Sequence, residues 1–278
     1  MNDIVLLEAG RRKAGQRYRR YYERYLWSGG FLALLFGWSM VDLGISARLF
    51  IEGIPHFLVL LAEMFPPNWQ ALTGGKVLWS ILETLSMAFL GTFLGAIISF
   101  VLGILAAGNV TPSRAVREAA RTLMAVERAV PTLVIILLLL VVVGLGPFGG
   151  MLALAIGSVG MLGKLFAEAI ENVDPKPLES LESAGATKMQ IIRYSVLPQV
   201  VPSFIANALY QFDINLRAAL FLGVVGGGGV GFNLHMAMSL FRYADALAIT
   251  VVILVMILLA EKTADYLRRK IIGQEVLQ

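Results

Sequence analysis

The stretch VLWSILETLSMAFLGTFLGAIISFVLGILAA, from Val77 to Ala107, decides the fold class of this chain. Its single ionisable residue is Glu83, and the remaining residues are apolar, small or hydroxylated. A helix needs roughly 20 mostly apolar residues to cross about 30 Å of hydrocarbon. The stretch is therefore predicted to span a membrane as one helix.

The composition of the whole chain has the same character. Of its 278 residues, 58% are hydrophobic and only 15% are charged, and the mean hydropathy is +0.76. Soluble domains carry about 25% charged residues, so this chain has too many apolar side chains for an aqueous core. The absence of cysteine excludes disulfides and thiolate ligands, and the two histidines, His56 and His235, lie far apart. No metal site is predicted.

Six windows are long and apolar enough to span a membrane, so the sequence predicts an all-α polytopic membrane protein with six transmembrane helices. The windows run from Leu26 to Ile45, Val77 to Ala107, Leu123 to Val143, Gly149 to Ile170, Pro202 to Val225 and Ala244 to Leu267. Between the first two, Ser46 to Phe65 has apolar residues at helical spacing opposite a charged face, which predicts an amphipathic helix on the membrane surface. The predicted divisions are a basic cytoplasmic segment at 1–25, the first span with the external helix at 26–76, a core at 77–270 and a cytoplasmic tail at 271–278.

The orientation follows from the basic residues. Most of the 23 Lys and Arg residues lie on one side of the membrane if the N-terminus is cytoplasmic. The outer segments then hold only Arg48, Lys76 and Arg242. By the positive-inside rule, both termini are predicted in the cytoplasm, as an even number of spans requires. Topology thereby accounts for the net charge of +4, and no nucleic-acid partner is predicted.

The longest internal cytoplasmic loop, Asn172 to Gln199, predicts two short helices joined by a glycine hinge. Gly185 suits a left-handed stop after the first helix. Thr187 and Gln190 have the spacing of a capping box, which predicts a second helix that ends before Pro198. The loop alone cannot bury the apolar faces of both helices, so a partner surface is predicted.

The same loop carries the residues of a known motif. Glu179-Ser180-Leu181, Gly185 and Ser195-Val196-Leu197-Pro198 make the segment resemble the EAA loop of ABC importer permeases. Ser180, Leu181 and Ser195 depart from the pattern of that loop. In the family, the loop is the coupling helix that docks on a cytoplasmic ATPase. The coupling residues that the resemblance implies are Glu179, Leu181, Glu182, Ala184, Gly185, Ala186, Leu197 and Pro198.

Over residues 77–270 the chain is similar to permeases of phosphonate and phosphite importers. The similarity is carried by Gly144 to Gly149, Gly163-Lys164-Leu165 and Tyr210 to Ala219. It implies a type I ABC importer permease fold, a homodimer, two ATP-binding cassette subunits that bind ATP and Mg, and an external solute-binding protein. It also implies a multi-pass protein in the lipid of the bacterial inner membrane that imports phosphonate, phosphite or a related phosphorus oxyanion by alternating access. No cofactor or catalytic residue is expected in this chain.

The predicted fifth span has two opposed polar faces, because a helix turns by 100° per residue. The amide face consists of Asn207, Gln211 and Asn215. It is predicted to line the translocation path together with Glu83, since amides can hydrogen-bond a hydrated oxyanion without binding it too tightly. Asp213 and Arg217 are predicted to form a structural ion pair, with a place on the path as the alternative.

Glycines mark three further features. Small residues recur every four positions from Gly91 to Gly103, which predicts a ridge for close helix packing. The G-x-G-x-x-G match at 144–149 follows no strand, so a tight turn is predicted rather than a dinucleotide site. The third feature is predicted to be a flexible outer gate or an unwound helix end. It comprises Gly226, Gly227, Gly228, Gly229 and Gly231.

Two other functions stay open at this point. A permease for methionine or another amino acid would share the loop and the glycine run. From a different class, an intramembrane hydrolase is the alternative, although the spans hold no G-x-S-x-G or HExxH motif. The chain also lacks the G-x-x-x-x-G-K-[ST] phosphate-binding loop, so the ATPase is expected to be a separate chain.

Overall fold

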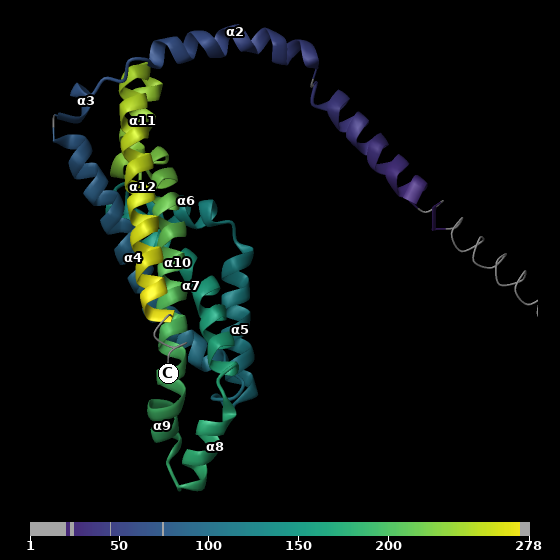
Figure 1. Ribbon diagram of the computed structural model, residues 1–278, viewed down its shortest axis with the longest axis vertical. Helices are drawn as coiled ribbons and strands as arrows, with labels where there is room; N and C mark the ends of the chain where they lie inside the picture. The colour runs from purple at the N-terminus through teal and green to yellow at the C-terminus, as the bar shows by residue number, and fades with distance from the viewer. Residues whose placement is uncertain (1–20, 23–24, 45, 74, 273–278) are drawn as a thin grey trace, which may run out of the picture. The chain divides into compact units, whose positions relative to one another are not determined.

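The protein is built from helices (Figure 1). The computed structural model describes residues 21–22, 25–44, 46–73 and 75–272, and no strand occurs among them. After a helix over 25–42, the elements are α2 (Ala47–Met64), α3 (Gln70–Thr73), α4 (Lys76–Ala106), α5 (Arg114–Ala129), α6 (Thr132–Val143), α7 (Pro147–Glu171), α8 (Pro175–Ser183), α9 (Lys188–Ile191), a π-helical turn (Ile192–Val196), α10 (Leu197–Val224), α11 (Gly229–Ser239) and α12 (Tyr243–Ile272). The all-α fold class predicted from the sequence is confirmed.

The chain divides into two compact units, and each is described by itself. The units are residues 1–62 and residues 63–278. The first contains the helix over 25–42 and nearly all of α2. α2 ends at Met64, just before Pro66 and Pro67, which cannot continue a helix. The helix predicted from Ser46 to Phe65 is confirmed, and its place on the membrane surface stays a prediction.

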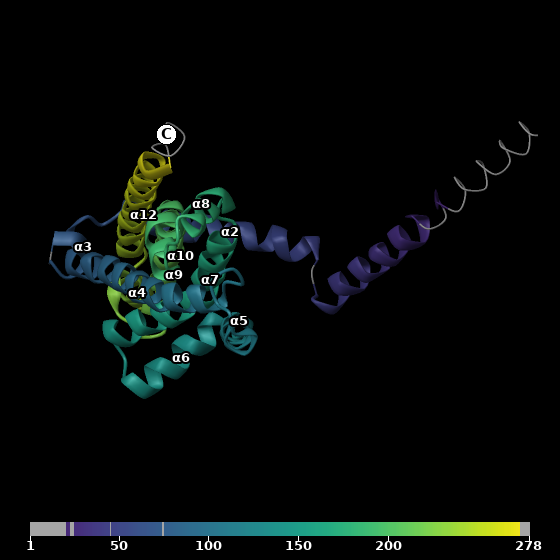
Figure 2. The same ribbon diagram turned by 90° about the horizontal axis from the view of Figure 1, so that it is seen from below.

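In the second unit, α4, α7 and α10 pack against one another, and α12 packs against α10. α5 and α6 both lie against α7, as the view in Figure 2 shows. The buried side chains between these helices are mainly aliphatic, and the rings of Phe166 and Phe204 lie 4.3 Å apart. This bundle holds the predicted coupling loop and the polar faces of the fifth span.

α4 and α7 approach each other closely along a row of small residues. A Cβ placed on Gly91 would lie 2.7 Å from Cβ of Leu154, and one on Gly103 would lie 2.9 Å from Cβ of Phe166. Both distances are shorter than real Cβ contacts, so only glycine permits this separation of the two helices. The predicted packing ridge from Gly91 to Gly103 is confirmed.

The predicted span from Leu123 to Val143 is wrong as a single straight helix. It is divided between α5 and α6, which meet at 90°. The cause is Pro131, which has no backbone N–H to donate and forces the preceding residue out of the helical region. Val130 accordingly has φ −81° and ψ 123°.

Length and composition allow three described helices to cross a membrane on their own, namely α4, α7 and α12. Two bent pairs, α5 with α6 and the α9–α10 segment with α11, raise the number to five at most. The first predicted span, Leu26 to Ile45, corresponds to the helix over 25–42, and its last residue lies outside the described residues. That helix is not among the five. The number of six is therefore not confirmed, whereas a multi-pass membrane protein is.

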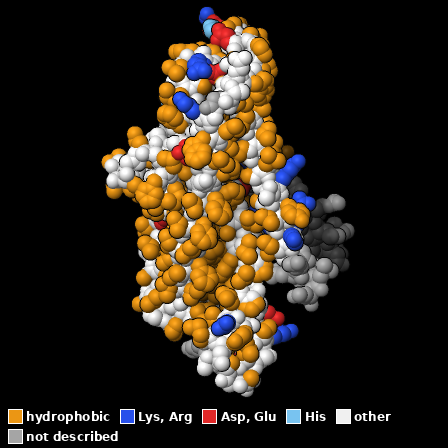
Figure 3. All heavy atoms as spheres, turned by 90° about the vertical axis from the view of Figure 1, so that its left-hand side faces the viewer, with side chains coloured by type: hydrophobic (Ala, Val, Ile, Leu, Met, Phe, Trp, Pro, Cys, Tyr) orange, Lys and Arg blue, Asp and Glu red, His pale blue; other side chains and the backbone are white. Residues whose placement is uncertain are grey.

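The outer surface of the bundle agrees with a lipid environment. Hydrophobic side chains cover most of the face shown in Figure 3. Large exposed hydrophobic residues on α4 include Leu82, Phe89, Phe93, Ile97 and Val101. A soluble monomer rarely exposes apolar surface on this scale, so hydrocarbon rather than water is the solvent here.

Candidate functional site

The predicted coupling loop begins with α8, and a side chain caps this helix. Asp174 Oδ1 accepts a hydrogen bond from the backbone N–H of Lys176 at 3.0 Å. The backbone N–H of Asp174 donates to Gln199 Oε1 at 2.9 Å, which ties the two ends of the loop together. Glu179 lies exposed in the middle of α8, where a partner can reach it.

Gly185 ends α8 in the left-handed conformation that the sequence predicts. Its φ is +78°, and its backbone N–H donates to the carbonyl of Glu182 at 2.9 Å. The N–H of Ala186 donates to the carbonyl of Leu181 at 3.0 Å, which completes the helix stop. No heavy atom lies within 4 Å of a Cβ built on Gly185, so the backbone angle alone requires glycine.

The second half of the loop begins as predicted and continues differently. The backbone N–H of Thr187 donates to Gln190 Oε1 at 2.7 Å, and the N–H of Gln190 donates to Thr187 Oγ1 at 3.4 Å, so the capping box is confirmed. The predicted end before Pro198 is wrong, because the chain stays helical through a π turn into α10. Pro198 lies directly after this π turn, in the first turn of α10.

Most of the predicted coupling residues lie on the surface of the loop. Glu179, Glu182, Ala184, Gly185 and Pro198 are exposed, and Leu181, Ala186 and Leu197 are half-buried. Two large side chains beside them, Met189 and Tyr194, are 72% and 64% exposed. In Figure 1, α8 and α9 lie together at one end of the second unit. The loop thus presents an apolar surface that a partner protein can cover.

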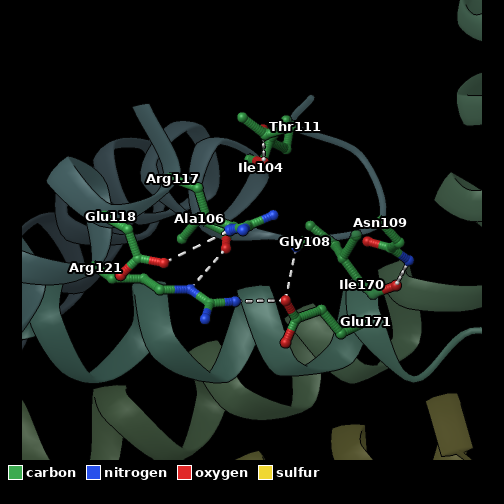
Figure 4. A network of polar contacts seen from close by, with 10 residues as sticks. All are labelled: Ile104, Ala106, Gly108, Asn109, Thr111, Arg117, Glu118, Arg121, Ile170 and Glu171. Atoms are coloured by element: carbon green, nitrogen blue, oxygen red, sulfur yellow. Dashed lines mark hydrogen bonds and ion pairs between the residues drawn. The ribbon is translucent and has the colours of Figure 1, made fainter. Parts of the chain in front are cut away.

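Next to the start of the loop, a polar network joins three helices of the bundle (Figure 4). Glu171, the last residue of α7, accepts through Oε1 from Arg121 Nη2 and from the backbone N–H of Gly108, both at 2.6 Å. Arg121 also donates through Nε to the carbonyl of Ala106 at 3.0 Å. The last turn of α7 is therefore bonded to α5 and to the C-terminal end of α4. These contacts lie directly before Asn172, where the loop begins.

The amide face of α10 is directed into the bundle. Gln211 and Asn215 are only 4% and 3% exposed, and Gln211 Nε2 donates to Asn215 Oδ1 at 3.1 Å. Asn215 Nδ2 donates to Ser158 Oγ of α7 at 2.8 Å and to Thr92 Oγ1 of α4 at 2.9 Å. These two amides connect three helices, and their predicted role on the translocation path stays a prediction. Asn207, the third amide, is half-buried.

The charged face of α10 forms the predicted ion pair. Arg217 Nη2 lies 3.0 Å from Asp213 Oδ2 and 3.7 Å from Glu261 Oε2 of α12. The Arg217 side chain is 52% exposed, whereas that of Asp213 is 16% exposed. Asp213 Oδ1 is buried without a hydrogen-bond partner among the described residues. A half-exposed cation thus lies on the face of α10 opposite to the buried amides.

The glycine run interrupts the helix that the fifth span begins. α10 ends at Val224, α11 begins at Gly229, and the two helices differ in direction by 42°. Glu83, the other predicted path residue, accepts through Oε2 from the backbone N–H of Gly229 at 2.8 Å. The run is therefore a break between two helices, and Glu83 contacts the break directly.

The chain matches a known protein family over most of its length. The sequence profile described as "Binding-protein-dependent transport system inner membrane component" matches residues 99–273. The chain belongs to this family. The resemblance drawn from the loop of this transport component is confirmed at the family level.

This transport component is similar to two named permeases and to one solved transporter structure. The phosphite transport system permease protein PtxC of Stutzerimonas stutzeri is 39% identical over 67% of this chain and 67% of its own length. The phosphate-import permease protein PhnE of Mycolicibacterium smegmatis is 39% identical over 70% of this chain, which spans only 34% of that relative. A membrane subunit in inward-facing structures of the MetNI methionine ABC transporter is 20% identical, with a TM-score of 0.63 over 71% of this chain and 97% of that one. This last likeness shows the fold alone.

Several hydrogen-bond partners of the candidate site residues were not predicted from the sequence. Thr92 and Ser158 hold the buried amides, and Arg121 with Gly108 holds Glu171. Thr92 and Ser158 could have been found from the sequence, because each is a hydroxyl residue in the middle of an apolar span and such groups need hydrogen-bond partners in a membrane.

Proposed function

We propose that this transport component is the permease subunit of an ATP-driven importer. It works as a homodimer with two ATP-binding cassette subunits, which bind ATP and Mg, and with an external solute-binding protein. The observation that carries the proposal is the loop that follows α7 in a chain of this family, with Glu179, Gly185 and Pro198 exposed and Leu197 half-buried. The permease itself catalyses no chemistry.

The solute of this proposal is phosphite, phosphonate or a related phosphorus oxyanion. The names of two relatives at 39% identity, which refer to phosphite and phosphate, support it. A methionine-type permease has weaker support, because a relative named as a probable D-methionine transport system permease protein is only 28% identical over 60% of this chain, and the methionine transporter structure is only 20% identical. An intramembrane hydrolase has no support from the family.

In the proposed mechanism, ATP-driven closure of the cassettes moves the two coupling loops. Residues 77–270 form the transport core. Movement of α8 passes to α7 and, through Glu171 and Arg121, to α5 and the end of α4. The core then alternates between inward-open and outward-open states. The glycine break between α10 and α11 acts as the outer gate.

We place Arg217 on the solute path and the buried amides Gln211 and Asn215 in the interhelical contacts. The support is the difference in exposure, because only the charged face offers a cation that an oxyanion can reach. Arg217→Gln should therefore reach the membrane and lower oxyanion uptake strongly. Asn207→Leu, on the half-buried amide, tests the other face in the same assay. Loss of folded protein in Arg217→Gln, with recovery in Asp213→Asn/Arg217→Gln, would return the pair to a structural role.

The solute assignment is tested with the complete complex. The permease, its cassette subunit and its binding protein are reconstituted in proteoliposomes, and ATP-dependent uptake of labelled phosphite, methylphosphonate, phosphate and methionine is measured. We expect uptake of at least one phosphorus oxyanion and none of methionine. Uptake of methionine alone would replace the proposal by its alternative.

A further inference from the structure

The break between α10 and α11 leaves backbone N–H groups that need acceptors. The first N–H groups of any helix have no partner within that helix. In a membrane protein, water is scarce and each unsatisfied group costs free energy. At the start of α11, Gly228 and Gly229 both have positive φ, +80° and +75°, so the chain enters this helix through a backbone conformation that favours glycine.

One face of α4 supplies these acceptors. Glu83 Oε2 accepts from the N–H of Gly229 at 2.8 Å, and Thr84 Oγ1 accepts from the N–H of Val230 at 2.9 Å. One turn away, Ser80 Oγ accepts from Asn233 Nδ2 at 2.7 Å. The carboxylate of Glu83 is also favoured at this position because the N-terminus of a helix carries partial positive charge.

The turn before α7 holds the break from a second direction. The N–H of Gly146 donates to the carbonyl of Gly226 at 3.0 Å. A Cβ on Gly226 would lie 2.8 Å from Cδ2 of Leu145, and one on Gly228 would lie 3.1 Å from Cγ of Pro147. The two glycine-rich segments, far apart in the sequence, therefore form one interlocked structure.

We propose that Ser80, Glu83 and Thr84 form a latch that holds α11 against α4 and keeps the outer gate closed in this conformation. Opening of the gate then requires release of the hydrogen bonds to Gly229 and Val230. Glu83 is a positioning residue for the gate rather than a contact of the solute. The inference rests on the proposed function, in which the glycine break is the outer gate and cassette closure is coupled to its opening.

The latch is tested first by a distance that does not depend on transport. The chain has no native cysteine, so spin labels can be placed on exposed Leu78 of α4 and on Leu240 after α11. Their distance distribution is measured in lipid nanodiscs by pulsed dipolar spectroscopy. We expect Glu83→Leu/Thr84→Val to add a longer distance, and the matched Glu83→Gln/Thr84→Ser, which keeps both acceptors, to resemble the parent. If the double variant does not fold, Thr84→Val alone is measured against Thr84→Ser. Identical distributions in the tested pair would overturn the latch.

A second measurement separates a gate from a merely structural cap. Since gate opening and cassette closure are coupled, weakening the latch should raise ATP hydrolysis in the absence of binding protein by about fivefold or more. A changed distance with unchanged hydrolysis would overturn the gating role. Failure of the proposed function appears separately, as absence of solute uptake by the parent complex.

Discussion

At position 185 only the backbone angle demands glycine, since φ is +78° and a Cβ would meet no heavy atom within 4 Å. Gly185→Val should strain the turn by about 1–2 kcal/mol, whereas Gly185→Asn should be tolerated because Asn adopts the left-handed conformation more readily. We expect both variants to reach the membrane and only the valine variant to lose ATPase on co-purification. Equal ATPase retention by the two would show that the hinge is not needed for docking.

Asn215 illustrates how a single buried residue supports the bundle. Asn215→Leu removes the acceptor of Gln211 Nε2, and Gln211 is only 4% exposed. A buried donor without a partner costs about 1–3 kcal/mol, so the thermal midpoint in detergent should fall clearly. Asn207→Leu is the matched control, because Asn207 is half-buried and its hydrogen bond to Ser203 is long, at 3.5 Å. A midpoint for Asn215→Leu no lower than that of the control would contradict the packing role.

The contacts of single residues could be predicted where both partners lie within one helix or turn. The left-handed Gly185, the Thr187 capping box and the pairing of Asp213 with Arg217 follow from spacing within one helix or turn. The burial of Asn215 did not follow, because helical periodicity defines a face without saying which neighbour covers that face. Only the packing of α10 against α4 and α7 decides this.

Among the helices, the contact between α4 and α7 depends on small residues. A Cβ on Gly95 would lie 2.8 Å from the carbonyl oxygen of Ala155, a backbone atom that cannot rotate away. Gly95→Ala should therefore separate the helices and cost about 1–3 kcal/mol, measured as lower folded yield and thermal midpoint. Gly53→Ala in α2 is the control, since nothing lies within 4 Å of its Cβ. Equal stability of the two variants would mean that the helices do not need this approach.

Helix positions were predictable from hydropathy, and helix interruptions were not. α4, α7 and α12 match their predicted spans within a few residues. The 90° bend after α5 was not predicted, because one proline, Pro131, hardly changes the mean hydropathy of the window from Leu123 to Val143. Conversely, Pro198 predicted an end that the π turn avoids. Proline marks a possible break, and the neighbouring contacts decide whether the helix bends, ends or continues.

At the scale of the whole molecule, the two ends of the core differ in their exposure and in their polar contacts. The end with the loop is exposed and carries the network of Arg121 and Glu171. The other end holds the two glycine segments, which contact each other, and Glu83 and Thr84 bond to the second of them. α7 and α10 connect these ends directly, because the network lies at the last residue of α7 and the glycine break follows the last residue of α10. This arrangement lets a change at one end bias the other.

The orientation of the core in the membrane gives the last prediction. The asymmetry of Lys and Arg predicts the loop on the cytoplasmic side and the α11 end outside. In the cysteine-free chain, single cysteines at exposed Gln70 or Leu240 should react with an impermeant thiol reagent in intact cells, and cysteines at Ser180 or Ser183 should react only after lysis. Exposed positions are chosen for the cysteines because a thiol must be accessible to react. Asn68 and Asn233 lie on the same predicted outer side but are held in hydrogen bonds, so they are less suitable. Labelling of Ser183→Cys from outside would place the coupling loop on the wrong side of the membrane for any cytoplasmic ATPase, and the proposed function would fail with it.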